Sequence, residues 1–310
     1  MVHRFGVAST SDERRTRPGP FRGLLGGAAG SRVGPVRILI SADMEGATGV
    51  TGVDDVIAGT EPWQRFRELF TGDVNACVSG LFAAGATEAL VNEAHSIQRH
   101  LLLERLDGRA RMLTGRHKPL SMMEGIDSGV DGVVFLGYHT GAGAEGVLSH
   151  TYMESGLSGV WLDGIHASEG RLNAALATEH GVPVLLVTGD DLTCLEAGSY
   201  APECRTVPVK ECVSRYAAVC STPERTGSAI RTTASDAMGL AGRGAGAVEP
   251  HRIELEFTGT HLAAAASLVP TVEQLSPRRV GFDAADMTTA MKTFKVITTV
   301  ASKAAQDTYG

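Results

Sequence analysis

The chain alternates short apolar runs with longer segments in which apolar residues recur at helical spacing. "VRILISAD" (residues 36–43) is a continuous apolar run of the kind that forms a covered strand. Further apolar runs lie at residues 87–96, 130–143 and 181–191. Residues 66–86 and 169–181 show the helical spacing, and the second of these segments closes with a glycine, as helices often do. Strands that alternate with helices predict an α/β fold with a largely parallel, covered sheet and flanking helices.

Composition and the spacing of apolar residues divide the chain into three parts. Residues 1–35 are rich in Arg, Gly and Pro without a sustained apolar period, so we interpret them as a disordered leader; a targeting segment is the alternative. Residues 36–200 are predicted to form the α/β domain. Residues 201–310 contain a strand pattern at 251–259 and a helical pattern at 284–306, and they are predicted to form a smaller C-terminal α+β domain.

Polar side chains follow three of the predicted strands, at the point where each strand ends. Asp43 and Glu45 follow the first strand, His95 the second and His139 the third. Ligands bind at the carboxyl ends of the strands in open α/β sheets, so these side chains are predicted to share one crevice. Carboxylates and imidazoles suit zinc or a similar divalent ion. Asp43 and Glu45 are two residues apart and would point the same way on a regular strand, where a cation would offset their repulsion.

Further candidates lie downstream, and each candidate also has a plain structural reading. His150 lies in "GVLSHTYME", and Glu169 opens a predicted helix, where a carboxylate also complements the helix dipole. Spacing alone leaves Glu154 and His166 open as well. A single histidine after a strand is more often a hydrogen-bonded residue than a ligand, and a single Asp or Glu can be a turn or cap residue. The joint pattern at three strand ends is therefore what indicates a metal site.

Composition narrows the class of protein. The 310 residues are 43% hydrophobic and 20% charged, which is ordinary globular composition, and the formal charge of −7 argues against a nucleic-acid binder. No apolar run is long enough for a membrane span. The five cysteines form no CxxC pair, which indicates reduced thiols and a cytoplasmic protein. A Walker-type GK[ST] motif and a GxSxG motif are both absent, which argues against phosphate-loop and serine-hydrolase chemistry.

Five motifs occur in order along the chain, namely "SADMEG", "VNEAHS", "FLGYHTGA", "GVLSHTYME" and "SEGRLNA". They resemble the successive motifs of the zinc-dependent D-aminopeptidase family, and the resemblance runs from about residue 36 to about residue 302. It implies a centre of two zinc ions per chain, held by Asp43, Glu45, His95, His139 and Glu169. It also implies that His150 assists catalysis without being a permanent ligand. The spacing between His150 and Glu169 is about one residue longer than in the family, which a single insertion in a loop at residues 154–164 would explain.

The resemblance implies an aminopeptidase that acts on short peptides with an N-terminal D-residue, such as D-Ala-D-Ala. It also implies a homo-oligomer, because family members assemble into rings, with a small peptide as the partner rather than nucleic acid or membrane. The residues themselves show no D-preference, and their ligand types also accept manganese or cobalt. Two alternatives stay open: a metal-dependent amidohydrolase acting on a peptide natural product or another small amide, and a non-catalytic binding protein that keeps the fold. The physiological substrate and the oligomer number are open at this stage.

Overall fold

The structure is a computed structural model that describes residues 34–305, so the predicted leader lies almost entirely outside the described residues. Within them, the larger sheet has the strand order β3-β2-β1-β4-β7-β8-β9. Its strands are β1 Arg37–Ala42, β2 Glu88–Glu93, β3 Ala110–Leu113, β4 Gly132–Leu136, β7 Val184–Asp190, β8 Arg205–Ser214 and β9 Ala217–Cys220. All neighbours pair in parallel except the edge strand β9, which confirms the predicted largely parallel sheet.

A second, antiparallel sheet has the order β11-β12-β10-β5-β6. Its strands are β5 Leu157–Leu162, β6 Ile165–His166, β10 His251–Phe257, β11 Glu273–Gln274 and β12 Arg279–Ala284. The α-helices are α1 Glu61–Ala83, α2 Glu169–Glu179, α3 Asp191–Tyr200, α4 Pro223–Ala237, α5 Thr260–Ala266 and α6 Met287–Ala304. Short 3-10 turns lie at Val53–Asp55, Leu103–Arg105, Ser121–Met123, Ile126–Ser128, Glu154–Gly156 and Met238–Leu240. Among the described helices, none combines the length and the apolar character needed to cross a membrane.

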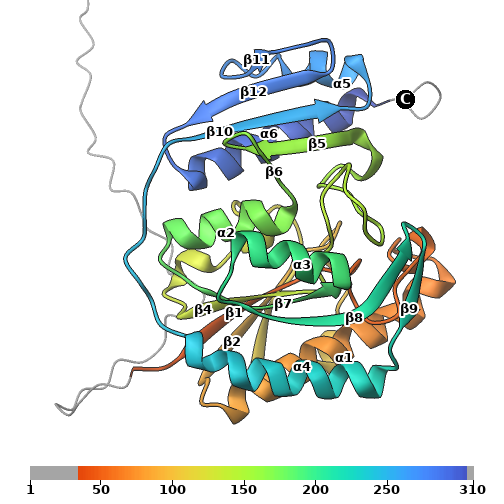
Figure 1. Ribbon diagram of the computed structural model, residues 1–310, viewed down its shortest axis with the longest axis vertical. Helices are drawn as coiled ribbons and strands as arrows, with labels where there is room; N and C mark the ends of the chain where they lie inside the picture. Colours follow the sequence, from red (N-terminus) through yellow and green to blue (C-terminus); the bar gives the residue numbers. More distant parts are fainter. Residues whose placement is uncertain (1–33, 306–310) are drawn as a thin grey trace, which may run out of the picture.

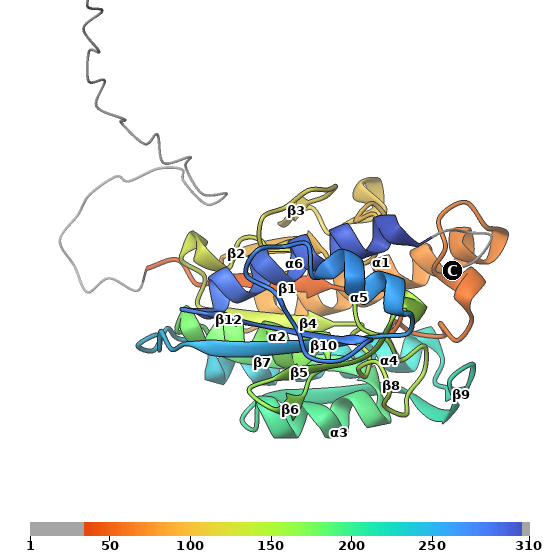
Figure 2. The same ribbon diagram turned by 90° about the horizontal axis from the view of Figure 1, so that it is seen from above.

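The elements stack in layers (Figure 1). Helices α1 and α4 pack against each other below the larger sheet, α2 and α3 lie above it, and the second sheet with α5 and α6 lies beyond α2. Figure 2 shows the second sheet and α6 lying over the larger sheet when the molecule is seen from above. This arrangement confirms an α/β fold with a smaller second sheet.

The alternation of side chains along β1 explains how the layers hold together. Ile38 and Ile40 are fully buried in the core that faces α1 and α4, where they join Phe70. Leu39 points to the opposite face, into a second core that continues through α2 to Phe294 of α6. Successive strand residues face opposite sides of a sheet, so a strand covered on both faces must be apolar at every position. The apolar run in the sequence is unbroken because β1 is covered on both faces of the sheet.

The two sheets are interleaved along the chain. Strands β8 and β9 and helix α4 follow residue 200 yet belong to the layers of the larger sheet, whereas β5 and β6 precede it and belong to the second sheet. A domain boundary at residue 200 stays a prediction, and the sheet membership of these elements speaks against it. The expectation of a loop at residues 154–164 is wrong, because this segment contains β5. The segment is short and contains glycines, so its sequence does not indicate a strand. The strand β5 pairs with β10, which is distant in the sequence.

Candidate metal centre

The predicted strand-end residues converge because β2, β1 and β4 are parallel neighbours in the larger sheet. Asp43 and Glu45 follow β1, His95 follows β2 and His139 follows β4, all at the same edge. These four side chains are buried, with 2 to 7% of their surface exposed. The prediction that three strand ends deliver two carboxylates and two imidazoles to one place agrees with this arrangement.

Two glycines allow the loops after β1 and β4 to meet. The Gly46 N–H donates to the Gly137 carbonyl at 2.7 Å, and a Cβ atom on Gly46 would lie 1.9 Å from the carbonyl oxygen of Tyr138. Gly137 has φ +72°, and a Cβ there would lie 2.1 Å from the Asp43 carbonyl oxygen. Only glycine fits so close a backbone approach. These glycines therefore bring the side chains of Asp43 and His139 together.

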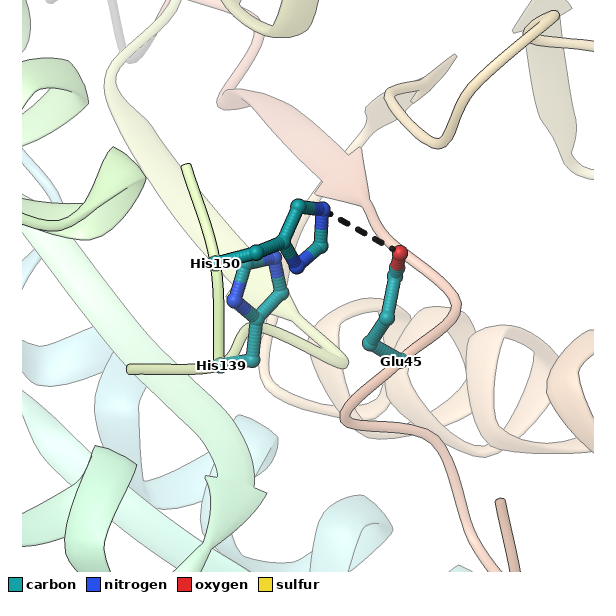
Figure 3. A group of neighbouring side chains, drawn as sticks. All are labelled: Glu45, His139 and His150. Carbon is teal, nitrogen blue, oxygen red and sulfur yellow. Dashed lines mark ion pairs between the residues drawn. The ribbon is translucent and has the colours of Figure 1, made fainter. Parts of the chain in front are cut away.

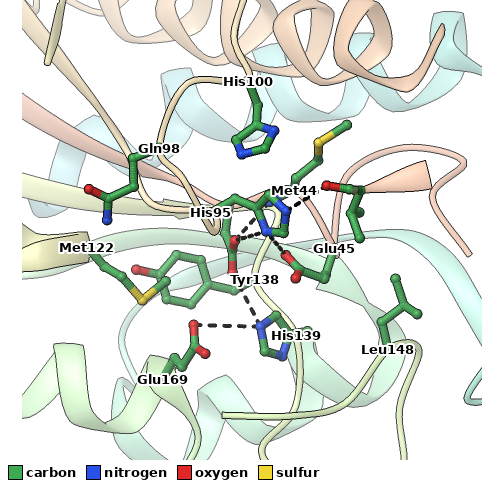
Figure 4. Close-up of polar contacts among 12 residues, drawn as sticks. Met44, Glu45, His95, Gln98, His100, Met122, Tyr138, His139, Leu148 and Glu169 are labelled. Carbon is green, nitrogen blue, oxygen red and sulfur yellow. Dashed lines mark hydrogen bonds and ion pairs between the residues drawn. The ribbon is translucent and has the colours of Figure 1, made fainter. Parts of the chain in front are cut away.

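Asp43 and Glu45 lie in a turn beyond the end of β1 at Ala42, so the expectation of regular strand geometry is wrong. Both nevertheless face the same imidazole. His95 Nδ1 lies 2.7 Å from Glu45 Oε2 (Figure 4). The same nitrogen lies 3.5 Å from Asp43 Oδ1. The turn therefore directs both carboxylates to the same side, as the alternation of side chains on a regular strand would have done.

Glu169 reaches the cluster from the first turn of α2. Ser168 caps this helix by accepting a hydrogen bond from the Arg171 N–H. Glu169 is only 5% exposed, and its Oε1 accepts the backbone N–H of Tyr152 at 2.7 Å. Its Oε2 lies 3.6 Å from His139 Nε2, which in turn lies 3.4 Å from Asp43 Oδ2. The carboxylate is therefore directed onto the cluster and does more than complement the helix dipole.

His150 lies beside these residues but is less enclosed. Its Nε2 is 3.6 Å from Glu45 Oε1 (Figure 3), and its ring stacks on that of His139 with centroids 4.2 Å apart. The side chain of His150 is 12% exposed, against 2% for His139. In the described part of the chain, Glu154 and His166 do not join any of the groups of potential ligand atoms.

Each of the three imidazoles uses one nitrogen to bind a backbone carbonyl. The pairs are His95 Nε2 with Val56 O at 3.0 Å, His139 Nδ1 with Thr140 O at 2.9 Å and His150 Nδ1 with Leu148 O at 2.9 Å. A carbonyl oxygen only accepts, so these nitrogens carry the proton. When such a ring is neutral, its other nitrogen has a lone pair that can bind a metal ion lying between the ring and the carboxylates, which is how metal-binding histidines are oriented.

The cluster has the properties of a cation site. Asp43 Oδ2 and His139 Nε2 face each other at 3.4 Å, and neither makes a hydrogen bond within the described structure although both atoms are buried. Burial favours the neutral form of Asp43, but the imidazoles of His139 and His95 outweigh it and hold the pKa of Asp43 well below its usual value. Burial opposes charge on His139 too, but the carboxylates of Glu169 and Asp43 raise its pKa well above the usual value.

These shifts in the pKa values of Asp43 and His139 show that positive charge close to the carboxylates stabilises the cluster. Protons on His139 and His95 supply it when no cation is bound, and a divalent ion could supply it in their place. The ligand atoms fall into three overlapping groups whose members lie within 4.8 Å of one another. The groups are Asp43–Glu45–His95, Asp43–His139–Glu169 and Glu45–His139–His150. The donor set therefore fits one or more divalent ions of the zinc type.

The cluster opens into a cavity of about 820 Å³. The same cavity is lined by residues that the sequence did not single out, namely Tyr152, Arg116, Lys118 and Lys295. Tyr152 Oη is buried and has no hydrogen-bond partner within residues 34–305. Burial lowers the pKa of Lys118 to about 8. Lys295 lies in a helix whose other lysines are exposed, and no local pattern distinguishes it from them.

The fold and the cluster together define an α/β protein with a buried carboxylate–imidazole metal site at the carboxyl ends of parallel strands. The family model described as D-aminopeptidase (Peptidase_M55) matches residues 36–296. The D-aminopeptidase of Bacillus subtilis (strain 168) is 34% identical over 271 residues, which are 86% of this chain and 98% of that protein. The chain belongs to the D-aminopeptidase family, and it is a peptide hydrolase.

A solved structure agrees with this assignment. The Zn-dependent D-aminopeptidase DppA from Bacillus subtilis, described as a self-compartmentalizing protease, matches with a TM-score of 0.82 and 33% identity. The match covers 86% of this chain and 98% of that one. The family resemblance and the prediction of an enzyme are thereby confirmed.

Proposed function

We propose that the protein is a zinc-dependent aminopeptidase that removes the N-terminal D-residue from short peptides of the D-Ala-D-Ala type. The observation that carries the proposal is the buried pair of unpartnered ligand atoms on Asp43 and His139 at the base of the cavity. The zinc dependence of the Bacillus subtilis relative supports the choice of metal. Family membership supports the reaction class.

Two zinc ions per chain suit the way in which the ligand groups overlap. Asp43 belongs to two groups, with its Oδ1 facing His95 and its Oδ2 facing His139. Glu45 and His95 would hold one ion, His139 and Glu169 would hold the other, and Asp43 would be within reach of both. When bound, zinc lowers the pKa of a coordinated water towards neutrality and polarises the carbonyl of the substrate.

His150 is the proposed catalytic residue. Its Nδ1–H is committed to the Leu148 carbonyl, so proton exchange takes place at Nε2, which faces Glu45. At that atom the ring can give a proton to the leaving amine or donate a hydrogen bond to the developing oxyanion. The N-terminal amine of the substrate would be held in its neutral form by a zinc ion, or by a nearby carboxylate of the cavity.

The relative's description as a self-compartmentalizing protease supports a homo-oligomer for this protein too. The cavity volume falls in the range of about 300–1,000 Å³ that is typical of small-molecule sites, which suits a short peptide. We also propose a cytoplasmic location, because the five cysteines are free and lie outside any disulfide in the described structure.

The test combines elemental analysis with a rate measurement. Purified protein is expected to hold about two zinc ions per chain and to release D-Ala from D-Ala-D-Ala, and a chelator should abolish the release until zinc is restored. L-Ala-L-Ala is the matched substrate control. Bound metal with cleavage of other amides but not of D-peptides would favour the amidohydrolase alternative. Absence of metal after reconstitution would contradict the proposed site.

A further inference from the structure

The cavity that contains the metal ligands has a second charged wall, of opposite sign. Arg116, His117 and Lys118 line it from the segment after β3, and Lys295 lines it from α6. In the described structure, none of these residues forms an ion pair with Asp43, Glu45 or any other carboxylate. The basic wall is therefore not a counter-charge of the metal cluster.

The hydrogen bonds of this wall leave two cations with free capacity. Lys118 is buried, and its Nζ donates to Asn92 Oδ1 and to the Glu93 carbonyl, both at 2.5 Å, so Lys118 supports the end of β2. Lys295 Nζ donates to the Lys118 carbonyl, which joins α6 to this segment. Arg116 is exposed and has neither a hydrogen bond nor an ion pair from its guanidinium within residues 34–305.

Arg116 and Lys295 also act on each other. Burial lowers the pKa of Lys295, the Glu124 carboxylate opposes that effect, and the charge of Arg116 adds to it. The Oε2 of Glu124 accepts the Leu120 N–H at 2.8 Å, and Glu124 is not among the residues that line the cavity. The cavity lining at Arg116, Lys118 and Lys295 is therefore basic, and a concave surface lined by one sign of charge attracts ligands of the opposite sign.

Helix α6 presents a polar stripe to the cavity around Lys295. Thr298, Thr299 and Ser302 line the cavity at the spacing of one helix face. Each hydroxyl donates to a carbonyl one turn earlier in its own helix. Lys295 is therefore the residue of this stripe with donors left for a ligand.

We propose that Arg116 and Lys295 form a subsite for the C-terminal carboxylate of the substrate, so that the enzyme selects short peptides with a free C-terminus over amides and capped peptides. This inference rests on the proposed function and extends it to substrate class. A dipeptide has an amine at one end and a carboxylate at the other, and the cavity has a metal-binding end for the amine and a basic wall for the carboxylate. Lys118 is a positioning residue that fixes the basic wall to β2.

The test compares D-Ala-D-Ala with its C-terminal amide on the zinc-loaded enzyme. We expect the free acid to be preferred by about ten- to a hundredfold in kcat/KM, mainly through KM, as charge-assisted hydrogen bonds to a carboxylate would give. Lys295→Met and Arg116→Met should lose most of this preference, because they should lower kcat/KM for the free acid far more than kcat/KM for the amide. Lys295→Arg should restore part of it. Lys292→Met is the matched control, because Lys292 is exposed on the same helix and does not line the cavity.

A binding measurement separates this inference from the proposed function. Calorimetric titration of both ligands into the zinc-loaded His150→Ala protein reports affinity without requiring turnover. Tighter binding of the acid that is lost in the added Lys295→Met change would support the subsite even if wild-type protein fails to cleave D-peptides. Equal binding of acid and amide, or a preference that survives both substitutions, would overturn the subsite while leaving the peptidase proposal intact.

Discussion

The loop that joins β1 to α1 separates two groups of buried charges that differ in one respect. On its cavity side, Asp43 is 2% exposed and its Oδ2 has no hydrogen bond within the described chain. On its opposite side, Lys210 of β8 is also 2% exposed, but its Nζ donates to three carbonyls of the loop. The acceptors are Glu45 O at 2.6 Å, Ala47 O at 3.1 Å and Val50 O at 2.6 Å.

The contrast shows what marks a functional charge in this protein. Lys210 and its neighbour Asp73 are buried charges whose hydrogen-bonding atoms find protein partners, and they hold the shape of the loop. Asp43 and His139 are buried to the same extent but leave ligand atoms unpartnered towards a cavity. Burying an unpaired charge is costly, so such a cluster is stable only with a ligand or protons to balance it. Burial combined with unsatisfied atoms, rather than burial alone, indicates the site.

Among the proposed variants, Asp43→Asn should have the largest effect, because it removes the charge on the cavity side of the loop. The substitution keeps the shape of the side chain. We expect loss of metal and of nearly all peptidase activity, because Asp43 belongs to two of the ligand groups. Elemental analysis and D-Ala-D-Ala hydrolysis on the same preparation check both effects. Full metal occupancy with normal activity in Asp43→Asn would contradict the ligand assignment.

His150→Ala should separate the metal from the proton chemistry. His150 is more exposed than His139 and is proposed to act on substrate, so the variant should keep its zinc and lose about 10³-fold in kcat. Zinc per chain and kcat are measured together. Because His150 shares a ligand group with Glu45 and His139, a zinc-depleted variant would instead make His150 a ligand.

The cavity side of the loop could be predicted from sequence because its signals are local. Asp43, Glu45, His95 and His139 each lie within three residues of the end of an apolar strand, and parallel strands bring their ends together. The prediction needed strand positions and order but no side-chain packing. The α/β class followed from the same periodicity.

The opposite side of the loop could not be predicted in this way. Lys210 lies 165 residues from Glu45 in the sequence, and nothing in "TVPVKECVS" shows that its ammonium is buried. Lys295 faces the cavity only because α6 packs over α2, which is a tertiary contact. β5 was missed for the same reason, since its strand character depends on pairing with β10. Contacts between distant segments are fixed by packing, and a local pattern carries no information about them.

Lys210→Met tests whether the hydrogen-bonded buried charge opposite the cavity stabilises the loop. The apolar side chain would fill similar space but leave three buried carbonyls without their donor, so we expect the free energy of unfolding to fall by about 3 kcal/mol. Denaturant unfolding of the zinc-loaded protein measures it, with Lys292→Met as the exposed control. A loss equal to that of the control would mean that the loop does not depend on Lys210.

The smallest effect concerns Asp73, which accepts hydrogen bonds from Thr48 N at 2.8 Å and Thr48 Oγ1 at 2.9 Å. Burial raises the pKa of Asp73 to about 6, against the hydrogen bonds from Thr48 and the charge of Lys210. The folded state therefore binds more protons than the unfolded state between pH 4 and 6. The stability that protonated Asp73 contributes is present at pH 4 and is lost as the pH rises through 6, a change of about 2 kcal/mol.

Asp73→Asn removes this titration while keeping a carbonyl oxygen for Thr48 N and an amide that can donate to Thr48 Oγ1. The free energy of unfolding of the variant minus that of wild type should therefore increase by about 2 kcal/mol from pH 4 to pH 7. Taking the difference cancels the titration of His95 and His139, which both proteins share. Curves that run parallel across this range would show that Asp73 is ionised throughout, with Lys210 rather than a proton as its partner. In that case the buried charges around Lys210 would include an ion pair, as the cavity side of the loop includes carboxylates paired with imidazoles.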